Sequence, residues 1–129
     1  MAKRFQYIIV LICITTVISI IQSCDKHRAK KLAGIYDCEV NYYYWDMTPK
    51  IIDTSYNERL EIKQNGKFLT VLAYTIHIDS LWEGKEYYNG DVHNYIKVQF
   101  KKDSLYLTKN SGGLGGNSSF IYKGKKLTK

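Results

Sequence analysis

The sequence predicts an all-β domain of about seven or eight antiparallel strands, connected as a meander and closed as a small barrel, behind an N-terminal signal helix. Apolar residues alternate with polar ones in several segments, short turn sequences separate these segments, and 11 of the 12 tyrosines and both tryptophans lie after residue 31. The 98 residues from 32 to 129 are enough for that many strands. A two-layer β-sandwich is the alternative, because it also gives each strand one apolar face.

Turn sequences set the expected order of the strands. Residues 64–67, Gln-Asn-Gly-Lys, predict a tight hairpin, because Asn and Gly tolerate the positive φ of a type I′ turn. Residues 102–104 predict a second turn, and one helical turn is expected near 80–84, over a barrel end. The glycine-rich segment 111–117 is expected to be a mobile connection before the last strand. The expected strands are 34–45, 59–63, 68–78, 85–88, 92–101, 105–108 and 118–123, with 51–55 as the start of the second strand or a separate one.

The N-terminal segment has the successive basic and apolar regions of a secretory signal. Basic residues 3–4 precede an apolar stretch at 8–21, whose 14 residues suit a signal and are short for a membrane span of about 20 residues. The run Ile21-Gln22-Ser23-Cys24 resembles the processing site of a bacterial lipoprotein, where the peptidase cuts before the cysteine and lipid is attached to its sulfur. The resemblance implies a signal peptide at 1–23 and lipidation of Cys24. An uncleaved anchor helix is the alternative.

Lipidation at Cys24 implies an exported protein anchored to a bacterial membrane. We expect the outer membrane, with the domain facing the periplasm or the cell surface. Residues 24–31 are then the lipidated cysteine and a short basic tether, and residues 32–129 are the β-domain. The whole chain has a net charge of +7, but residues 32–129 hold 13 Lys and Arg against 11 Asp and Glu. Because nucleic-acid binding needs basic residues on a folded face, we expect no nucleic acid, and we expect a monomer.

The two ends of the domain resemble those of the lipocalin and calycin families. Residues Gly34 and Tyr36 match a Gly-x-Trp opening, with Tyr in place of Trp. Residues 120–126 resemble the closing strand of small calycin-like exported lipoproteins, where a basic residue packs across the first strand's aromatic ring. The resemblance implies a lipocalin-like barrel closed by Gly34, Tyr36 and Lys123, with Lys125 or Lys126 as alternatives to Lys123. An eight-stranded barrel holds side chains or one small ligand.

Aromatic residues supply the candidate binding surface. In residues 41–45, alternation places Tyr42 and Tyr44 on one face of a strand and Tyr43 and Trp45 on the other. Contiguous exposed aromatic surface often marks a binding site, although packing against a neighbouring loop is the alternative. The expected ligand-binding or partner-binding residues are Tyr43, Trp45, Tyr74, Trp82 and Tyr88.

The chemistry-bearing residues predict a binding protein and no enzyme. His77 and His93 lack the spacing of metal ligands, so we expect no catalytic residue, metal or cofactor. Cys38 is expected to be a small buried residue of the core. The expected function is non-enzymatic binding of a small apolar or amphipathic ligand. The alternative is an interaction module for an envelope protein, because Tyr36-Asp37-Cys38 resembles the Tyr-x-Cys strand of small exported lysozyme inhibitors.

Overall fold

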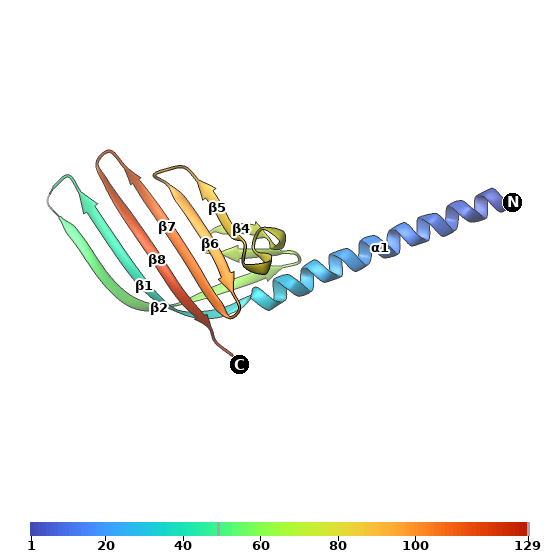
Figure 1. Ribbon diagram of the computed structural model, residues 1–129, viewed down its shortest axis with the longest axis horizontal. Coiled ribbons are helices and arrows are strands. Elements are labelled where there is room, and N and C mark those ends of the chain that lie inside the picture. Colours follow the sequence, from blue (N-terminus) through green and yellow to red (C-terminus); the bar gives the residue numbers. More distant parts are fainter. Residues whose placement is uncertain (49, 129) are drawn as a thin grey trace.

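A computed structural model describes residues 1–48 and 50–128 as one long helix followed by a curled antiparallel sheet (Figure 1). Two short 3₁₀ helices lie between the fourth and fifth strands. The elements are α1 (Ala2–Leu32), β1 (Gly34–Asp46), β2 (Ile51–Asn65), β3 (Phe68–Val71), β4 (Tyr74–His77), η1 (Ile78–Ser80), η2 (Trp82–Gly84), β5 (Glu86–Gly90), β6 (Tyr95–Lys101), β7 (Ser104–Gly113) and β8 (Gly116–Lys126).

The eight strands form one sheet in the order β4-β3-β2-β1-β8-β7-β6-β5. The first and last strands pair along most of their length, from Tyr36 opposite Lys126 to Asp46 opposite Gly116. Within residues 1–48 and 50–128, no ladder joins β4 to β5, and η1 and η2 connect these two edges. The predicted antiparallel sheet of about eight strands is therefore confirmed. Its closure into a barrel is not, because the consecutive strands β4 and β5 lie at opposite edges, and the sheet is a curled half-barrel.

Both predicted tight turns are present. Asn65 pairs with Phe68 across a two-residue loop in which Gly66 has a φ of +59°. Lys101 pairs with Ser104 across a second such loop, where Lys102 has a φ of +55°. The residues at 51–55 form the start of β2, which runs without a break to the first hairpin. The helical turn expected near residues 80–84 is also present, as η1 and η2.

The prediction of one strand over residues 68–78 is wrong. The chain reverses after Val71, where Leu72 has a φ of +53°, and Tyr74 pairs back with Val71 in the β3–β4 hairpin. This reversal lets Leu69 and Ile76, which pair with each other, both lie in the core. The apolar composition of 68–78 concealed the turn, because neither Leu72 nor Ala73 is a typical turn residue.

The glycine-rich segment is also ordered differently from the prediction. Residues 111–117 form the tip of the β7–β8 hairpin, in which Gly113 pairs with Gly116, and are not an unpaired connection. Side-chain amides stabilise this tip, because Asn110 and Asn117 each donate a hydrogen bond to the other, at 3.0 and 3.1 Å. A run of glycines can extend and pair when a neighbouring strand supplies the hydrogen bonds.

The core fills the half of the sheet nearest α1. Tyr36, at its centre, is fully buried and meets Phe100 edge-on at a ring distance of 5.7 Å. Gly124 on β8 lies so close to β1 that a Cβ there would be 2.5 Å from the Cys38 sulfur. Only glycine therefore fits without displacing the neighbouring side chains. The other fully buried large side chains are Ile62, Leu69, Ile76, Ile78, Leu81, Ile96, Leu105, Leu107, Val40, Val71 and Val98.

Helix α1 is long and apolar enough in its N-terminal part to cross a membrane, which fits either a signal sequence or a membrane anchor. Every residue from Met1 to Cys24 is exposed. The helix continues through Cys24 to Leu32, so the segment expected to be an extended tether forms its last two turns. Ala29 and Leu32 in these turns are part of the core. The sheet is therefore attached to the apolar helix without a flexible linker.

Candidate binding surfaces

An ion cluster fixes the end of α1 to the sheet. Arg28 donates hydrogen bonds to Asp25, one turn earlier on the helix, and to Asp79 on η1, the latter at 3.0 Å. Asp25 is 9% exposed, so its carboxylate depends on the guanidinium for compensation. The Arg28 guanidinium also lies 5.6 Å from the Trp82 ring centre. These contacts join the helix to the segment that bridges the two sheet edges.

Three hydrogen bonds to backbone carbonyls complete this attachment. The Gln64 amide donates to Lys26 O at 2.8 Å, and the Lys126 ammonium donates to Lys31 O at 2.7 Å. The Tyr36 hydroxyl donates to Leu32 O at 2.8 Å. The carbonyls of Lys31 and Leu32 are among the last four of the helix and have no partner within it, so these two donors from the sheet stabilise its end. The end of α1 is therefore a structural part of the β-domain.

The far half of the sheet, beyond the core, is covered on neither face. On the face continuous with the core, aromatic rings form a surface that we call the inner aromatic face: Tyr42, Tyr44, Tyr56, Phe120 and Tyr122. Tyr42 and Phe120 are stacked at a ring distance of 4.5 Å. Tyr56 is 41% exposed, and only Tyr122, nearest the core, is buried. The strands that carry this surface extend away from α1 to the hairpin tips (Figure 1), and we call the surface between the core and these tips the shelf.

The surroundings of three tyrosines on this face, Tyr44, Tyr56 and Tyr122, raise the pKa of their phenols. Burial raises the pKa of Tyr122 to about 12, and desolvation followed by the Glu58 charge raises the pKa of Tyr56. The Tyr44 hydroxyl donates to Asp46 at 2.9 Å, and this hydrogen bond raises the pKa of Tyr44. The inner aromatic face therefore offers rings and neutral hydroxyl groups, which suits an amphipathic ligand.

The five residues predicted to bind a ligand do not meet at one site. Tyr43 and Trp45 lie on the outer face of β1, opposite the core. Tyr88, on edge strand β5, stacks against Tyr95 at 5.7 Å. Tyr74 and Trp82 pack against the core, and Trp82 also faces α1. Two of the five predicted residues, Tyr43 and Trp45, therefore lie on the face of β1 that is opposite the core.

The residues expected to close a barrel do not make the expected contact, in which a basic side chain packs across the Tyr36 ring. Tyr36 points inward, whereas Lys123 pairs with Glu39 and projects from the outer face. Lys126 is directly opposite Tyr36, but its ammonium binds the α1 carbonyl, and its side chain lies over Gly34. Across residues 1–48 and 50–128, no basic group stacks on the Tyr36 ring.

The histidines and acids have structural partners. His77 accepts a hydrogen bond from the Asp79 backbone N–H at 3.1 Å and so caps η1. Asp25, His77 and Asp79 bring ligand-type atoms within 4.8 Å of one another. Arg28 donates to both carboxylates, which makes the group an ion-pair cluster rather than a cation site. His93 follows Asp91, whose carboxylate accepts its backbone N–H at 2.8 Å in an exposed turn.

Cys38 is a free, buried cysteine, as predicted from the sequence. It is 1% exposed, and burial raises the pKa of its thiol above the ordinary range. A protonated thiol in contact with Gly124 acts as a small apolar side chain. Its burial therefore explains this cysteine without a reactive role.

Comparisons with protein families, curated proteins and solved structures find no match. The class that the structure defines is a small mostly-β domain, a curled eight-stranded antiparallel half-barrel joined to an N-terminal apolar helix.

The sequence missed Tyr56, Phe120 and Tyr122 as members of the inner aromatic face. Register across β2, β1 and β8 brings them together, and only strand pairing shows this.

Proposed function

We propose that this chain is an exported lipoprotein, anchored through Cys24, whose β-domain binds an amphipathic ligand on the inner aromatic face. The observation that carries the binding proposal is the uncovered stack of Tyr42 and Phe120 beside the half-exposed Tyr44 and Tyr56. Because buried side chains fill the interior near α1, the ligand is expected on the open shelf rather than inside a closed barrel. Rings would contact its apolar part, and hydroxyl groups its polar part.

The geometry around Cys24 supports the anchoring proposal. Cys24 is exposed and directly precedes Asp25, the first buried residue of the chain. Cleavage before Cys24 would therefore remove only exposed residues and leave the buried turns of α1 in place. Two or more acyl chains on Cys24 would hold the domain stably at the membrane, since one chain alone is marginal.

Replacing Cys24 with serine tests the anchoring. We expect the protein to move from the membrane fraction to the soluble fraction, because serine provides no sulfur for lipid attachment. Mass spectrometry of the wild-type N-terminus should show a lipidated cysteine at position 24. Wild-type protein with an intact N-terminus and no lipid on Cys24 would instead identify α1 as an uncleaved anchor.

Replacing both Tyr42 and Phe120 with alanine tests the ligand proposal. The protein would be purified from its host and analysed by native mass spectrometry, where a bound small molecule adds a defined mass. We expect the wild-type adduct to fall at least tenfold in the variant, because each stacked aromatic contact contributes about 0.5–1.5 kcal/mol beyond its buried area. Tyr106→Ala, at a 44% exposed outer position on β7, is the matched control and should retain the adduct.

An envelope protein on the same face is the second candidate. In that case the wild-type protein would carry a protein partner and no small molecule, and the double variant would lose it. Inhibition of lysozyme at micromolar protein would favour the inhibitor-like alternative. Absence of both kinds of partner from the wild-type protein would contradict a binding function for the inner aromatic face.

A further inference from the structure

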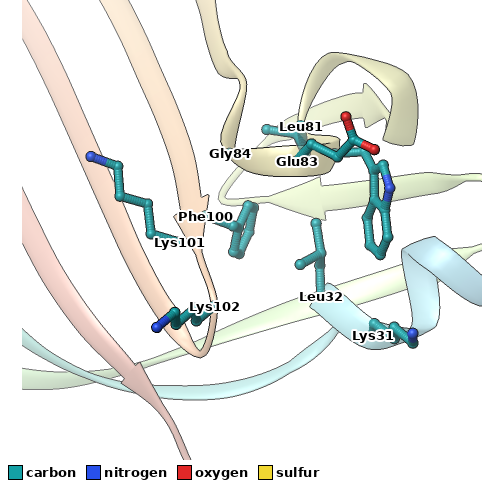
Figure 2. A pocket seen from close by; sticks show the side chains of 9 residues that line it. Lys31, Leu32, Leu81, Glu83, Gly84, Phe100, Lys101 and Lys102 are labelled. Carbon is teal, nitrogen blue, oxygen red and sulfur yellow. The ribbon is translucent and has the colours of Figure 1, made fainter.

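A pocket of about 440 Å³ lies where the end of α1 meets the bridging segment η1–η2 and the β6–β7 turn (Figure 2). It is separate from the inner aromatic face, which lies at the other end of the sheet. Its lining residues are Lys31, Leu32, Leu81, Trp82, Glu83, Gly84, Phe100, Lys101 and Lys102.

The floor of this pocket is apolar and rigid. Leu32, Leu81 and Phe100 belong to the core, and their side chains line the pocket (Figure 2). Trp82 forms a wall and is held in place by two cations, with the Arg28 guanidinium 5.6 Å and the Lys31 ammonium 6.0 Å from its ring centre. A ligand would therefore meet preorganised apolar surface there.

The mouth of the pocket is basic. Lys31 flanks it from α1 and Lys102 from the β6–β7 turn, on opposite sides of Leu32 in Figure 2, where the Lys102 side chain extends outward from the turn. Lys101 is directed away from the pocket, and its ammonium lies 5.7 Å from the Tyr106 ring centre. Glu83 is the one carboxylate among the lining residues that the structure describes. The balance of charge favours an anionic group above an apolar one.

Along α1, the residues that contact Trp82 run from within the lipid headgroup layer to just beyond it, if Cys24 lies at the hydrocarbon boundary. Arg28 and Lys31, which contact Trp82, follow Cys24 by four and seven residues, or about 6 and 10 Å along the helix axis. The headgroup layer extends roughly 5–7 Å beyond the hydrocarbon on each side of a bilayer. In Figure 1, the β2–β3 hairpin and η1–η2 lie beside these last turns of α1, so this end of the domain is the one nearest the membrane.

We propose that the Trp82 pocket binds the headgroup of an anionic lipid in the membrane that anchors the chain. Lys31 and Lys102 would pair with the phosphate, while Trp82 and Phe100 would contact the glycerol and the first methylenes of the acyl chains. The inference rests on the membrane anchoring proposed above. It does not depend on cleavage, because α1 is continuous through Cys24 and places the pocket at the same level in both forms.

The test uses the full chain in nanodiscs with equal amounts of phosphatidylglycerol and phosphatidylcholine. Native mass spectrometry counts the lipids that remain bound after release, and we expect phosphatidylglycerol to be enriched. The Lys31→Gln/Lys102→Gln variant should lose roughly 30-fold of this preference, because each lysine at an anionic surface contributes about fivefold. Glu83→Gln should raise it about fivefold, because the opposing carboxylate is removed.

A matched variant distinguishes lipid binding at the pocket from nonspecific attraction between exposed lysines and the anionic lipid. Lys109→Gln/Lys123→Gln removes two exposed lysines elsewhere on the sheet and should keep the wild-type preference. A second readout is the emission of Trp82 in a Trp45→Phe background, which should change between nanodiscs of the two lipids. Equal retention of both lipids by the wild-type protein would overturn the proposal. An equal loss of the phosphatidylglycerol preference in the two double variants would also overturn it. Failure of anchoring is distinguishable, because it appears as loss of the protein from the membrane fraction.

Discussion

Replacing Tyr36 with alanine is expected to lower the free energy of unfolding by about 3–5 kcal/mol, the largest effect of any change considered for this chain. The substitution removes a fully buried ring that packs against Phe100 and leaves a cavity at the centre of the core. It also deprives Leu32 O of its hydroxyl donor at the end of α1. Urea denaturation of a soluble form beginning at Asp25 measures this loss. That form keeps every buried residue of the chain, because all residues before it are exposed.

Two further variants divide the Tyr36 effect into its parts. Tyr36→Phe keeps the ring and removes only the hydrogen bond to Leu32 O, so its cost should be about 1 kcal/mol. Tyr106→Ala removes an exposed tyrosine from the outer face of β7, and its cost should stay within about 0.5 kcal/mol. Equal losses for Tyr36→Ala and Tyr106→Ala would show that Tyr36 is not in the core.

Replacing Arg28 with alanine is expected to release the end of α1 from the sheet and to lower the free energy of unfolding. The change leaves the carboxylate of Asp25 buried without its cationic partner, and removing one partner of a buried charged group is strongly destabilising. It also removes the guanidinium from the Trp82 ring. Hydrogen exchange should show faster exchange of the amides at residues 29–33, including the Ala33 N–H, which donates to Ala29 O at 3.0 Å.

Lys30→Ala is the control for this experiment, because Lys30 is an exposed basic residue on the same turn of the helix. It should leave both stability and exchange close to those of the wild type. Asp79→Asn should have a smaller effect than Arg28→Ala, because the Asp79 side chain is 60% exposed. Unchanged exchange at 29–33 in Arg28→Ala would show that apolar packing of Ala29 and Leu32 alone holds the helix.

Local signals in the sequence predicted the parts of the fold that depend on neighbouring residues. The turn at residues 64–67 carries the glycine needed for a positive φ, and alternation after residue 92 gives the buried face of β6 correctly. The aromatic strand at 34–45 is present almost as predicted. In each case a few adjacent residues contain the whole signal.

The features that the sequence did not predict depend on distant contacts. Alternation separates Tyr42 from Tyr43, but the direction of sheet curvature decides which of them faces inward, and it places Tyr42 with Phe120. Closure of the barrel could not be predicted, because the alternation of apolar and polar residues along each strand does not show whether β4 pairs with β5. The sequence predicted a short basic tether at residues 24–31, whereas this segment is helical and is fixed by Arg28 and Asp79, which are 51 residues apart in the chain.

The continuity of α1 with the sheet also sets how far the domain can act from the membrane. A flexible linker would allow the inner aromatic face to sample many heights and orientations, whereas the fixed helix end confines it to a narrow range. Strand β1 has 13 residues and spans about 43 Å, so the hairpin tips can stand at most about that far beyond the end of α1. Under the anchoring and the ligand binding proposed above, material bound on the shelf would therefore have to come within this distance of the lipid surface.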